Sequence, residues 1–335
     1  TILNINGVET KETLQAKIIY ERFSTNYILI LIFIYLVSCL IILGWNARFI
    51  HNYVFIIIIA MGIISAIINP IMDIPDEPAH LARAELTSRG ILFANGDPSD
   101  FNISQSVSSL IDNSFFKIED GKFTTSEGNY KYTGYYNNYA SSNIFISYIP
   151  QAIGIILGKL LGGSIAILLL GRICNLICYA LMVRYALKIA PKYKIGLSII
   201  AMMPMVIFIA ASFNQDASTY GLTLLAIAYF LKIYDKDTIN IKDIAIFSSI
   251  TILLGLIKLP YSILAGLIIF IPKEKFNDKK TYYKSFLFVG SVAIITVLWG
   301  LSSLLISSNT SSSTVTPFSI YYTENNVNAK AQIQY

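Results

Sequence analysis

Long apolar runs constrain the fold of this chain more than any other feature of its sequence. A helix needs about 20 apolar residues in a row to cross a bilayer core that is about 30 Å thick. Runs of this character lie at residues 27–45, 53–70, 164–189, 195–213, 217–234, 244–257, 261–271 and 286–306. Only helices and closed barrels cross lipid, because lipid offers the backbone no hydrogen bonds. The runs therefore predict an all-α polytopic membrane protein, in which the segments ending at 257 and 271 are short enough to be broken or tilted helices.

The polar stretches between these runs divide the chain into consecutive parts. They are a charged N-terminal segment (1–26), two membrane helices (27–70), a large loop (71–163), about six further membrane helices (164–306) and the start of a second polar loop (307–335). The chain begins with Thr1 and stops within polar residues, so we expect it to be a fragment at both ends. The segment 144–161 is apolar but is interrupted by Pro150, Gly154, Gly158 and Lys159, and we interpret it as an interfacial or re-entrant helix.

Lysines in the short loops predict the orientation of the chain, because cytoplasmic loops carry an excess of Lys and Arg. The lysine-rich loops lie at 188–194, 232–242 and 273–284. If all of them face the cytoplasm, the large loop lies outside the cell, provided that 144–161 does not cross the membrane. The same count also puts the basic N-terminal segment outside, which the rule does not favour.

The composition excludes several classes of function. Only 13% of the residues are charged, against roughly 25% in soluble domains. The net charge of +5 is spread in short clusters between the apolar runs, so we expect no nucleic-acid partner. Cys39, Cys174 and Cys178 all lie in apolar segments and are interpreted as packing residues. The sequence shows no glycine-rich phosphate loop, Ser-His-Asp set or Cys/His metal pattern, so it does not support a nucleotide-dependent activity.

The most distinctive polar motif is the sequence PDEPAH at residues 75–80, directly after the second apolar run. Pro78 suits the first turn of a helix whose N-cap is Asp76, and Gly90 suits the end of that helix. The motif therefore predicts an amphipathic helix at the start of the large loop.

Asp76 and Glu77 would lie near the lipid headgroups, at a depth fixed by the two prolines. A carboxylate there could act as a general base toward a hydroxyl, or it could bind a divalent cation such as Mg²⁺ or Mn²⁺. Asp76, His80 and Arg83 would point the same way on the predicted helix. In the alternative interpretation, Asp76 only caps the helix and Glu77 only complements its dipole. The motif alone does not decide between the two.

The motif at 75–80, followed by Arg83, resembles the signature of a bacterial family of predicted polytopic membrane proteins, domain-of-unknown-function family 2142. The resemblance continues at 148–152, 154, 157–158, 171–172, 175, 197–205, 212–216 and 258–261. It covers about residues 61–270. Each piece is weak by itself, but the combination in this order is specific.

That family in turn resembles the GT-C glycosyltransferases, which take a sugar from a polyprenyl-phosphate carrier and pass it to an acceptor outside the cytoplasmic membrane. The resemblance implies a GT-C-like helical bundle whose large outer loop carries juxtamembrane helices and an acidic residue acting as base. Asp76 occupies the matching position, with Glu77 assisting it. The segment 144–161 resembles the second juxtamembrane helix. Family members often have one membrane helix before the acidic motif, whereas this chain shows two.

Such an enzyme needs a base for the incoming hydroxyl and positive charge for the departing phosphate. Arg83, Arg172 and Lys258 are the candidates for that charge. Lys258 lies between two apolar segments, where an ionisable group indicates function, although Lys258 and Arg172 could instead extend to the membrane surface.

The candidate substrate-binding residues also include His80, Asp216 and Tyr261. His80 either orients a carboxylate, contacts a phosphate or makes only a structural hydrogen bond. Asp216 is either a second acidic site residue or the N-cap of the next helix, and we favour the cap. Tyr261 belongs to the motif at 258–261.

The sequence therefore predicts a glycosyltransferase in the cytoplasmic (inner) membrane of a bacterium, with its active face outside. Its expected partners are a polyprenyl-phosphate sugar donor, a cell-surface glycan acceptor and the lipid bilayer. Two alternatives stay open. One is a transporter or flippase of a lipid-linked saccharide, and the other is a non-catalytic partner in envelope assembly.

Overall fold

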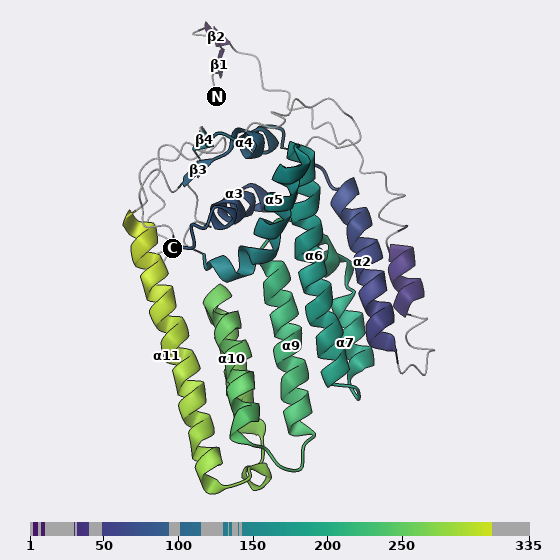
Figure 1. Cartoon of the computed structure of the whole chain (residues 1–335), viewed down its shortest axis with the longest axis vertical. Helices are drawn as coiled ribbons and strands as arrows, with labels where there is room; N and C mark the ends of the chain where they lie inside the picture. The colour runs from purple at the N-terminus through teal and green to yellow at the C-terminus, as the bar shows by residue number, and fades with distance from the viewer. Residues whose placement is uncertain are drawn as a thin grey trace.

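The long helices of the chain lie side by side in one bundle (Figure 1). The computed structural model describes residues 3–5, 8–10, 30, 32–39, 49–93, 101–114, 130–132, 134–135, 140 and 143–309. The longer helices are α2 (Ile50–Ile68), α6 (Ser164–Ile189), α9 (Asp216–Tyr234), α10 (Ile241–Ile257) and α11 (Lys279–Asn309). Helix α6 contacts both α2 and α9, and α10 lies between α9 and α11.

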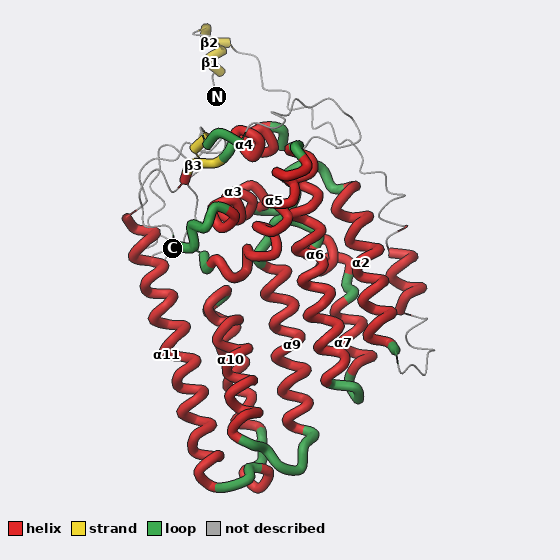
Figure 2. Tube along the Cα trace, in the orientation of Figure 1, coloured by secondary structure: helices red, strands yellow, loops and turns green. Residues whose placement is uncertain are grey.

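Shorter elements cover one end of this bundle (Figure 1). They are α3 (Glu77–Ser88), α4 (Gln105–Asp112), η4 (Phe145–Tyr148), α5 (Ile149–Leu161) and the antiparallel pair β3 (Asn102–Ile103) and β4 (Gly134–Tyr135). An apolar core joins α3, α4 and α5 to α6. The other named strands among the described residues are β1 (Leu3–Ile5) and β2 (Val8–Thr10). Most of the described chain is helical (Figure 2).

Four described helices are long and apolar enough to cross a membrane. They are Ile50–Ile68, Ser164–Ile189, Asp216–Tyr234 and Lys279–Ser302. These helices coincide with the apolar runs predicted near 53–70, 164–189, 217–234 and 286–306. The predicted all-α polytopic class is thereby confirmed.

The apolar run at 195–213 is not the single helix that its length predicts. It forms two short helices, α7 (Lys194–Ala201) and α8 (Pro204–Ala210), separated at Met203, whose backbone is extended (φ −52°, ψ 131°). Proline has no N–H group, and its ring disfavours helical backbone at the preceding residue. Pro204 therefore breaks this helix.

The other short runs also differ from uniform membrane helices. Helix α10 has 17 residues and begins where the Asp243 carboxylate accepts the backbone N–H of Asn240 at 3.1 Å. The run near 261–271 forms a 3₁₀ helix, η5 (Leu259–Phe270), and a further 3₁₀ turn, η6 (Lys273–Lys275), follows it. Of the run at 27–45, the structure describes residues 30 and 32–39, which are helical, and the remainder lies outside the described residues.

The lysine-rich loops lie together at the end of the bundle opposite α3, α4 and α5. The connections α6–α7, α9–α10 and η6–α11 are all at the lower end in Figure 1, whereas the short helices are at the upper end. This separation of charge agrees with the predicted orientation, in which the large loop lies outside the cell. The orientation itself stays a prediction.

Glycines allow α5 to pack closely on α6. A Cβ atom added at Gly154 would lie 2.3 Å from the carbonyl oxygen of Leu170, and one added at Gly158 would lie 2.5 Å from the backbone of Ile167. Lys159 and these glycines interrupt the apolar pattern of 144–161. The segment is accordingly a short helix at the loop end of the bundle, as the pattern indicated.

A Gly154→Ala variant is expected to be about 1–3 kcal/mol less stable, because the added methyl group overpacks a contact that is made with backbone. Thermal unfolding of the detergent-solubilised protein measures the change. Gly196→Ala is the matched control, since that helical glycine has open space around its Cβ position. Equal transition temperatures for the two variants would contradict the close packing of α5 on α6.

Candidate functional site

The turn before α3 holds two residues in the left-handed backbone region. Asp76, at the N-cap position of α3, has φ 65°, and Met72 has φ 54°. This conformation costs a non-glycine residue roughly 1–2 kcal/mol, and such strain is concentrated at functional sites. Asp76 is exposed and its side chain makes no cap hydrogen bond. Asp76 therefore occupies the predicted N-cap position without capping the helix through its carboxylate.

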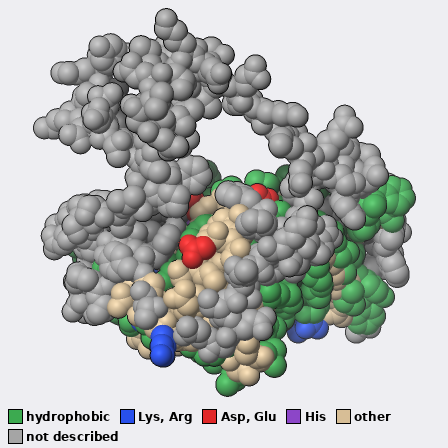
Figure 3. Space-filling model, turned by 90° about the horizontal axis from the view of Figure 1, so that it is seen from above, with side chains coloured by type: hydrophobic (Ala, Val, Ile, Leu, Met, Phe, Trp, Pro, Cys, Tyr) green, Lys and Arg blue, Asp and Glu red, His purple; other side chains and the backbone are tan. Residues whose placement is uncertain are grey.

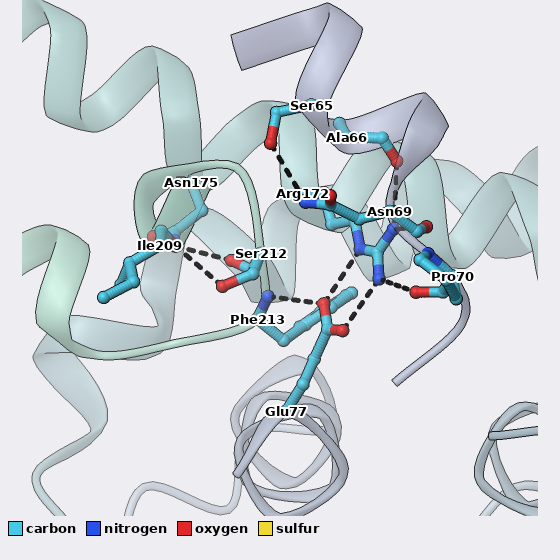
Figure 4. A network of polar contacts seen from close by, with 10 residues as sticks. All are labelled: Ser65, Ala66, Asn69, Pro70, Glu77, Arg172, Asn175, Ile209, Ser212 and Phe213. Atoms are coloured by element: carbon cyan, nitrogen blue, oxygen red, sulfur yellow. Dashed lines mark hydrogen bonds and ion pairs between the residues drawn. The ribbon is translucent and has the colours of Figure 1, made fainter. Parts of the chain in front are cut away.

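A fully buried ion pair fastens this turn to the bundle (Figure 4). The carboxylate of Glu77 binds Arg172 through two contacts, with Nη2 at 2.7 Å from Oε2 and Nε at 2.8 Å from Oε1. The other guanidinium hydrogens bind carbonyl oxygens at the end of α2, those of Ala66 (2.9 Å), Asn69 (3.0 Å) and Pro70 (2.8 Å). The pair thus joins α2, α3 and α6 at one point.

These contacts correct two predictions about the site. Arg172 makes as many hydrogen bonds as a guanidinium has N–H groups, and its side chain is 0% exposed, so no donor is left for a phosphate. Glu77 is also 0% exposed and additionally accepts the backbone N–H of Phe213 at 3.0 Å. It is therefore not a base that assists Asp76. Charged residues in apolar segments usually pair with one another, and this signal in the sequence was missed.

Arg83 is a structural residue as well, which corrects its predicted contact with phosphate. Its Nε donates to the carbonyl of Asn143 (3.1 Å), and Nη2 donates to that of Leu92 (2.7 Å). Nη1 donates to the hydroxyl of Thr87 at 2.9 Å. Burial lowers the pKa of Arg83 to about 10, so the side chain remains charged at neutral pH. Arg83 thereby joins α3 to the segments at Leu92 and Asn143.

His80 lies one turn beyond Asp76 on α3, and its side chain is buried. Its Nδ1 is 2.7 Å from the hydroxyl oxygen of Tyr148, and Nδ2 of Asn143 donates to the same hydroxyl at 2.9 Å. Burial lowers the pKa of His80 to about 4. The imidazole is therefore neutral at physiological pH, which does not favour a charge-based contact between His80 and a phosphate.

Asp216 and Lys258 form an ion pair near the same end of the bundle. The Nζ atom of Lys258 lies 2.5 Å from Oδ1 of Asp216, and the two side chains are 35% and 22% exposed. The preferred interpretation of Asp216 as an N-cap is wrong, because Gln215 holds that position and Asn214 Oδ1 accepts the Asp216 N–H at 2.8 Å. Tyr261 lies at the same junction, where its N–H donates to the carbonyl of Lys258 at 3.0 Å.

The electrostatic surroundings of His80 show which predicted residues the fold brings together. The carboxylates of Asp76 and Asp216 raise the pKa of His80 against the larger effect of burial, and Lys258 lowers it. These groups come from the turn before α3, the start of α9 and the end of α10. Figure 3 views the molecule from this end and shows acidic side chains at the surface among polar and backbone atoms.

Two residues of this region were missed by the sequence prediction. Asp73 lies half-buried in the same turn as Asp76, and its pKa is raised by burial and by Glu77, while Arg172 opposes the rise. Its position three residues before Asp76 was the available signal. Tyr148 belongs to the motif at 148–152 but had no role assigned to it.

A second buried carboxylate, Glu85, fastens the short helices to one another. Its oxygens accept the backbone N–H (2.9 Å) and the hydroxyl (2.6 Å) of Ser104, at the start of α4. Lys159 of α5 donates to the same carboxylate at 2.6 Å. Helices α3, α4 and α5 of the large loop are thereby fastened to one another.

The comparison with protein families confirms the resemblance seen in the motifs. The chain matches the family model for the predicted membrane protein family DUF2142 over residues 59–335. The chain belongs to the DUF2142 family. The match begins inside α2, so the helical residues 32–39 lie outside it. The comparisons with curated proteins and with solved structures gave no match.

In this DUF2142 protein, Asp76 was also predicted as a possible ligand of a divalent cation. Among the residues that the structure describes, no group of three or more His, Cys, Asp or Glu side chains is placed to hold a metal ion. A metal bound at Asp76 stays a prediction, and the geometry of neighbouring carboxylates adds no support to it.

The DUF2142 protein is expected to lose stability as the pH falls from about 6.5 to 4. The pKa of His80 is about 4 in the folded chain and about 6.5 in the unfolded chain, so the unfolded chain binds more protons in this window. The effect of this one residue is about 3 kcal/mol. Thermal unfolding at a series of pH values measures this loss of stability. The His80→Gln variant should lack the part of the loss that His80 causes, and the His51→Gln variant is the control. Identical pH profiles for wild type and His80→Gln would contradict the assignment.

Proposed function

We propose that this DUF2142 protein is a membrane glycosyltransferase of GT-C-like architecture. It moves a sugar from a polyprenyl-phosphate carrier to a cell-surface glycan or polymer, at the outer face of a bacterial cytoplasmic membrane. One observation carries the proposal. The exposed carboxylate of Asp76 lies on a strained turn. Both this carboxylate and the Asp216–Lys258 ion pair lie close enough to His80 to shift its pKa.

The position of Asp76 supports a substrate that is attached to a lipid. Helix α2 ends at Ile68, so Asp76 follows a membrane span by a few residues and lies where the headgroups of the bilayer are expected. The lysine-rich loops at the opposite end favour an outer location for this site. A polyprenyl-phosphate sugar presents its phosphate and sugar at this depth.

The reaction needs a base and a positive charge, and the site offers both. The hydroxyl oxygen of the acceptor attacks the anomeric carbon and forms the new glycosidic bond, while Asp76 accepts the hydroxyl proton. The bond between the anomeric carbon and the phosphate oxygen breaks, and polyprenyl phosphate leaves with the electron pair. Of the three cations considered for the phosphate, Arg83, Arg172 and Lys258, only Lys258 is partly exposed. Lys258 exchanges its contact with Asp216 for one with the leaving phosphate and stabilises the charge of that phosphate.

Reconstitution of the purified protein with a synthetic polyprenyl-phosphate sugar and a set of cell-surface glycans tests the proposal. We expect the donor to be consumed, polyprenyl phosphate to be released and the sugar to appear on one of the glycans. A donor that remains intact in the presence of folded protein and the complete set of glycans would oppose the proposal.

A transporter of lipid-linked saccharides is the second candidate, because one feature favours it. The break between α7 and α8 lies beside an apolar cavity of about 340 Å³, whose lining includes Met61, Asn69 and Phe208. Broken helices are typical of many transporters. The same reconstituted system separates the candidates, since a transporter moves the donor across the membrane unchanged and an assembly partner neither moves nor consumes it.

A further inference from the structure

An ion pair lies where the start of α9 meets the end of α10. The Nζ atom of Lys258 is 2.5 Å from Oδ1 of Asp216, and both side chains are partly exposed. Both residues lie at the end of the bundle that carries the short helices (Figure 1). A partly exposed ion pair stabilises a fold only slightly, because water solvates both charges when they separate. Lys258 can therefore exchange Asp216 for another anion.

Two tyrosine side chains lie next to this ion pair. Tyr220 follows Asp216 by one turn within α9, and aromatic side chains on a helix point back toward its N-terminus. Tyr261 lies in the first turn of η5, where its N–H donates to the carbonyl of Lys258 at 3.0 Å, and η5 packs on α9. Asp216, Lys258 and Tyr261 are all close enough to Tyr220 to interact electrostatically with its hydroxyl. The ammonium group and the two tyrosines are thus gathered at one junction.

Both tyrosine hydroxyls can bind a ligand. Within the part of the chain that the structure describes, neither hydroxyl bonds another residue, and the side chains of Tyr220 and Tyr261 are partly exposed. A tyrosine hydroxyl donates a hydrogen bond, and a lysine ammonium group binds phosphate as a point charge. The junction therefore offers an anion one positive charge and two hydroxyl donors.

We propose that Lys258, Tyr220 and Tyr261 bind the phosphate group of a lipid phosphate, and that Asp216 pairs with Lys258 when no phosphate is bound. The neighbouring side chains favour a lipid as the source of this phosphate. Leu259 and Ile263 of η5 are 41% and 80% exposed, and they follow Lys258 directly in the chain. A hydrocarbon chain attached to the phosphate can contact these apolar side chains, whereas free phosphate gains nothing from them.

The Asp216–Lys258 pair also lies near α3, because both charges are close enough to His80 to shift its pKa. Asp76 directly precedes that helix. In the proposed reaction, the phosphate bound at this junction belongs to the sugar donor and leaves with the lipid chain, while Asp76 accepts the proton of the acceptor hydroxyl. Naming the sugar donor as the ligand rests on the proposed glycosyl transfer, whereas the binding of a lipid phosphate does not.

Calorimetric titration of the purified protein with farnesyl phosphate, in a nonionic detergent, tests the site. Farnesol has the same chain without the phosphate, and inorganic phosphate has no chain. We expect farnesyl phosphate to bind at least about 10-fold more tightly than either compound, because each of them lacks one of the two sets of contacts. Equal affinity for farnesol overturns the phosphate site, and equal affinity for inorganic phosphate overturns a lipid as its ligand.

Substitutions at the junction separate the three binding groups. Tyr220→Phe and Tyr261→Phe should each weaken the binding of farnesyl phosphate by about 10-fold or more, and Lys258→Met by about 100-fold, as expected for hydrogen bonds to a charged group. The matched controls are Tyr234→Phe, at the other end of α9, and Lys242→Met, at the other end of α10, which should bind as the wild type does. Wild-type affinity in both folded tyrosine variants overturns the inference. These variants keep the aromatic ring, so they test the site even if Lys258→Met does not fold.

The substitution Asp216→Asn should have the opposite effect. It removes the carboxylate that competes with the phosphate for Lys258, so farnesyl phosphate should bind about 3- to 10-fold more tightly. If the ion pair serves only to fasten α9 to α10, the same substitution loosens the junction and does not improve binding. Unchanged or weaker binding by the folded variant therefore overturns the exchange of Asp216 for phosphate.

The binding assay and the transfer assay can fail independently. If the wild type binds farnesyl phosphate with this pattern of variants but transfers no sugar to any acceptor, the proposed function fails and the phosphate site stands. If the wild type transfers sugar but the tyrosine variants bind farnesyl phosphate normally, the phosphate site fails and the proposed function stands.

Discussion

An Asp76→Asn variant is expected to transfer sugar about 10²- to 10⁴-fold more slowly than the wild type, because it lacks the proposed general base for the acceptor hydroxyl. Asparagine has the same shape but cannot accept the proton. The carboxylate of Asp76 is exposed and makes no cap hydrogen bond, so its loss should leave α3 and the rest of the fold intact. Release of polyprenyl phosphate by the reconstituted protein measures the effect.

The matched control for this substitution is Asp112→Asn. Asp112 is an exposed acidic residue in the same large loop, at the end of α4 and outside the site. It should transfer sugar at the wild-type rate. Full activity in the Asp76→Asn protein would remove Asp76 from the mechanism, whereas a lowered transition temperature would indicate a structural role.

Arg172→Met should produce the largest loss of stability, on the order of 3–5 kcal/mol. The substitution leaves the buried charge of Glu77 without its partner. It also removes the donors to three backbone carbonyls at the end of α2. An unpaired buried charge costs far more than the intact pair contributes. We expect a much lower transition temperature and a poor yield of folded protein.

Arg184→Met is the matched control, since it removes the same side chain from the same helix. Arg184 is exposed, and its Nε donates to the side-chain oxygen of Asn52 at 2.9 Å. Its loss should cost less than about 1 kcal/mol. Similar transition temperatures for the two variants would contradict the structural role of the Glu77–Arg172 pair.

The predictions for Asp76→Asn and Arg172→Met concern two neighbouring residues of one turn, since Arg172 binds Glu77, which follows Asp76. Glu77 is anchored by Arg172, and the strained backbone of Asp76 directly precedes it. The buried pair supplies the fixed contacts that hold an unfavourable conformation, as strained sites require. Glu77, the residue adjacent to the proposed base, therefore supports it through position rather than through chemistry.

The sequence by itself determined the membrane class, the main apolar helices and the limits of α3. Apolar length is a local property, because each helix satisfies its own backbone hydrogen bonds in lipid. The start of α3 after Asp76 and its end before Gly90 followed in the same way from local backbone preferences. The break before Pro204 had an equally local cause, but the length of the apolar run concealed it.

Only the tertiary structure decided which of the charged residues are free to act. Arg83, Arg172 and Lys258 looked equivalent in the sequence, yet the two arginines are buried with their donors bound, and Lys258 remains partly exposed. The partners of Arg172 lie about a hundred residues away along the chain, so no local pattern indicates them. Whether a charge is available depends on burial and on hydrogen-bond partners, and both are set by how distant segments pack.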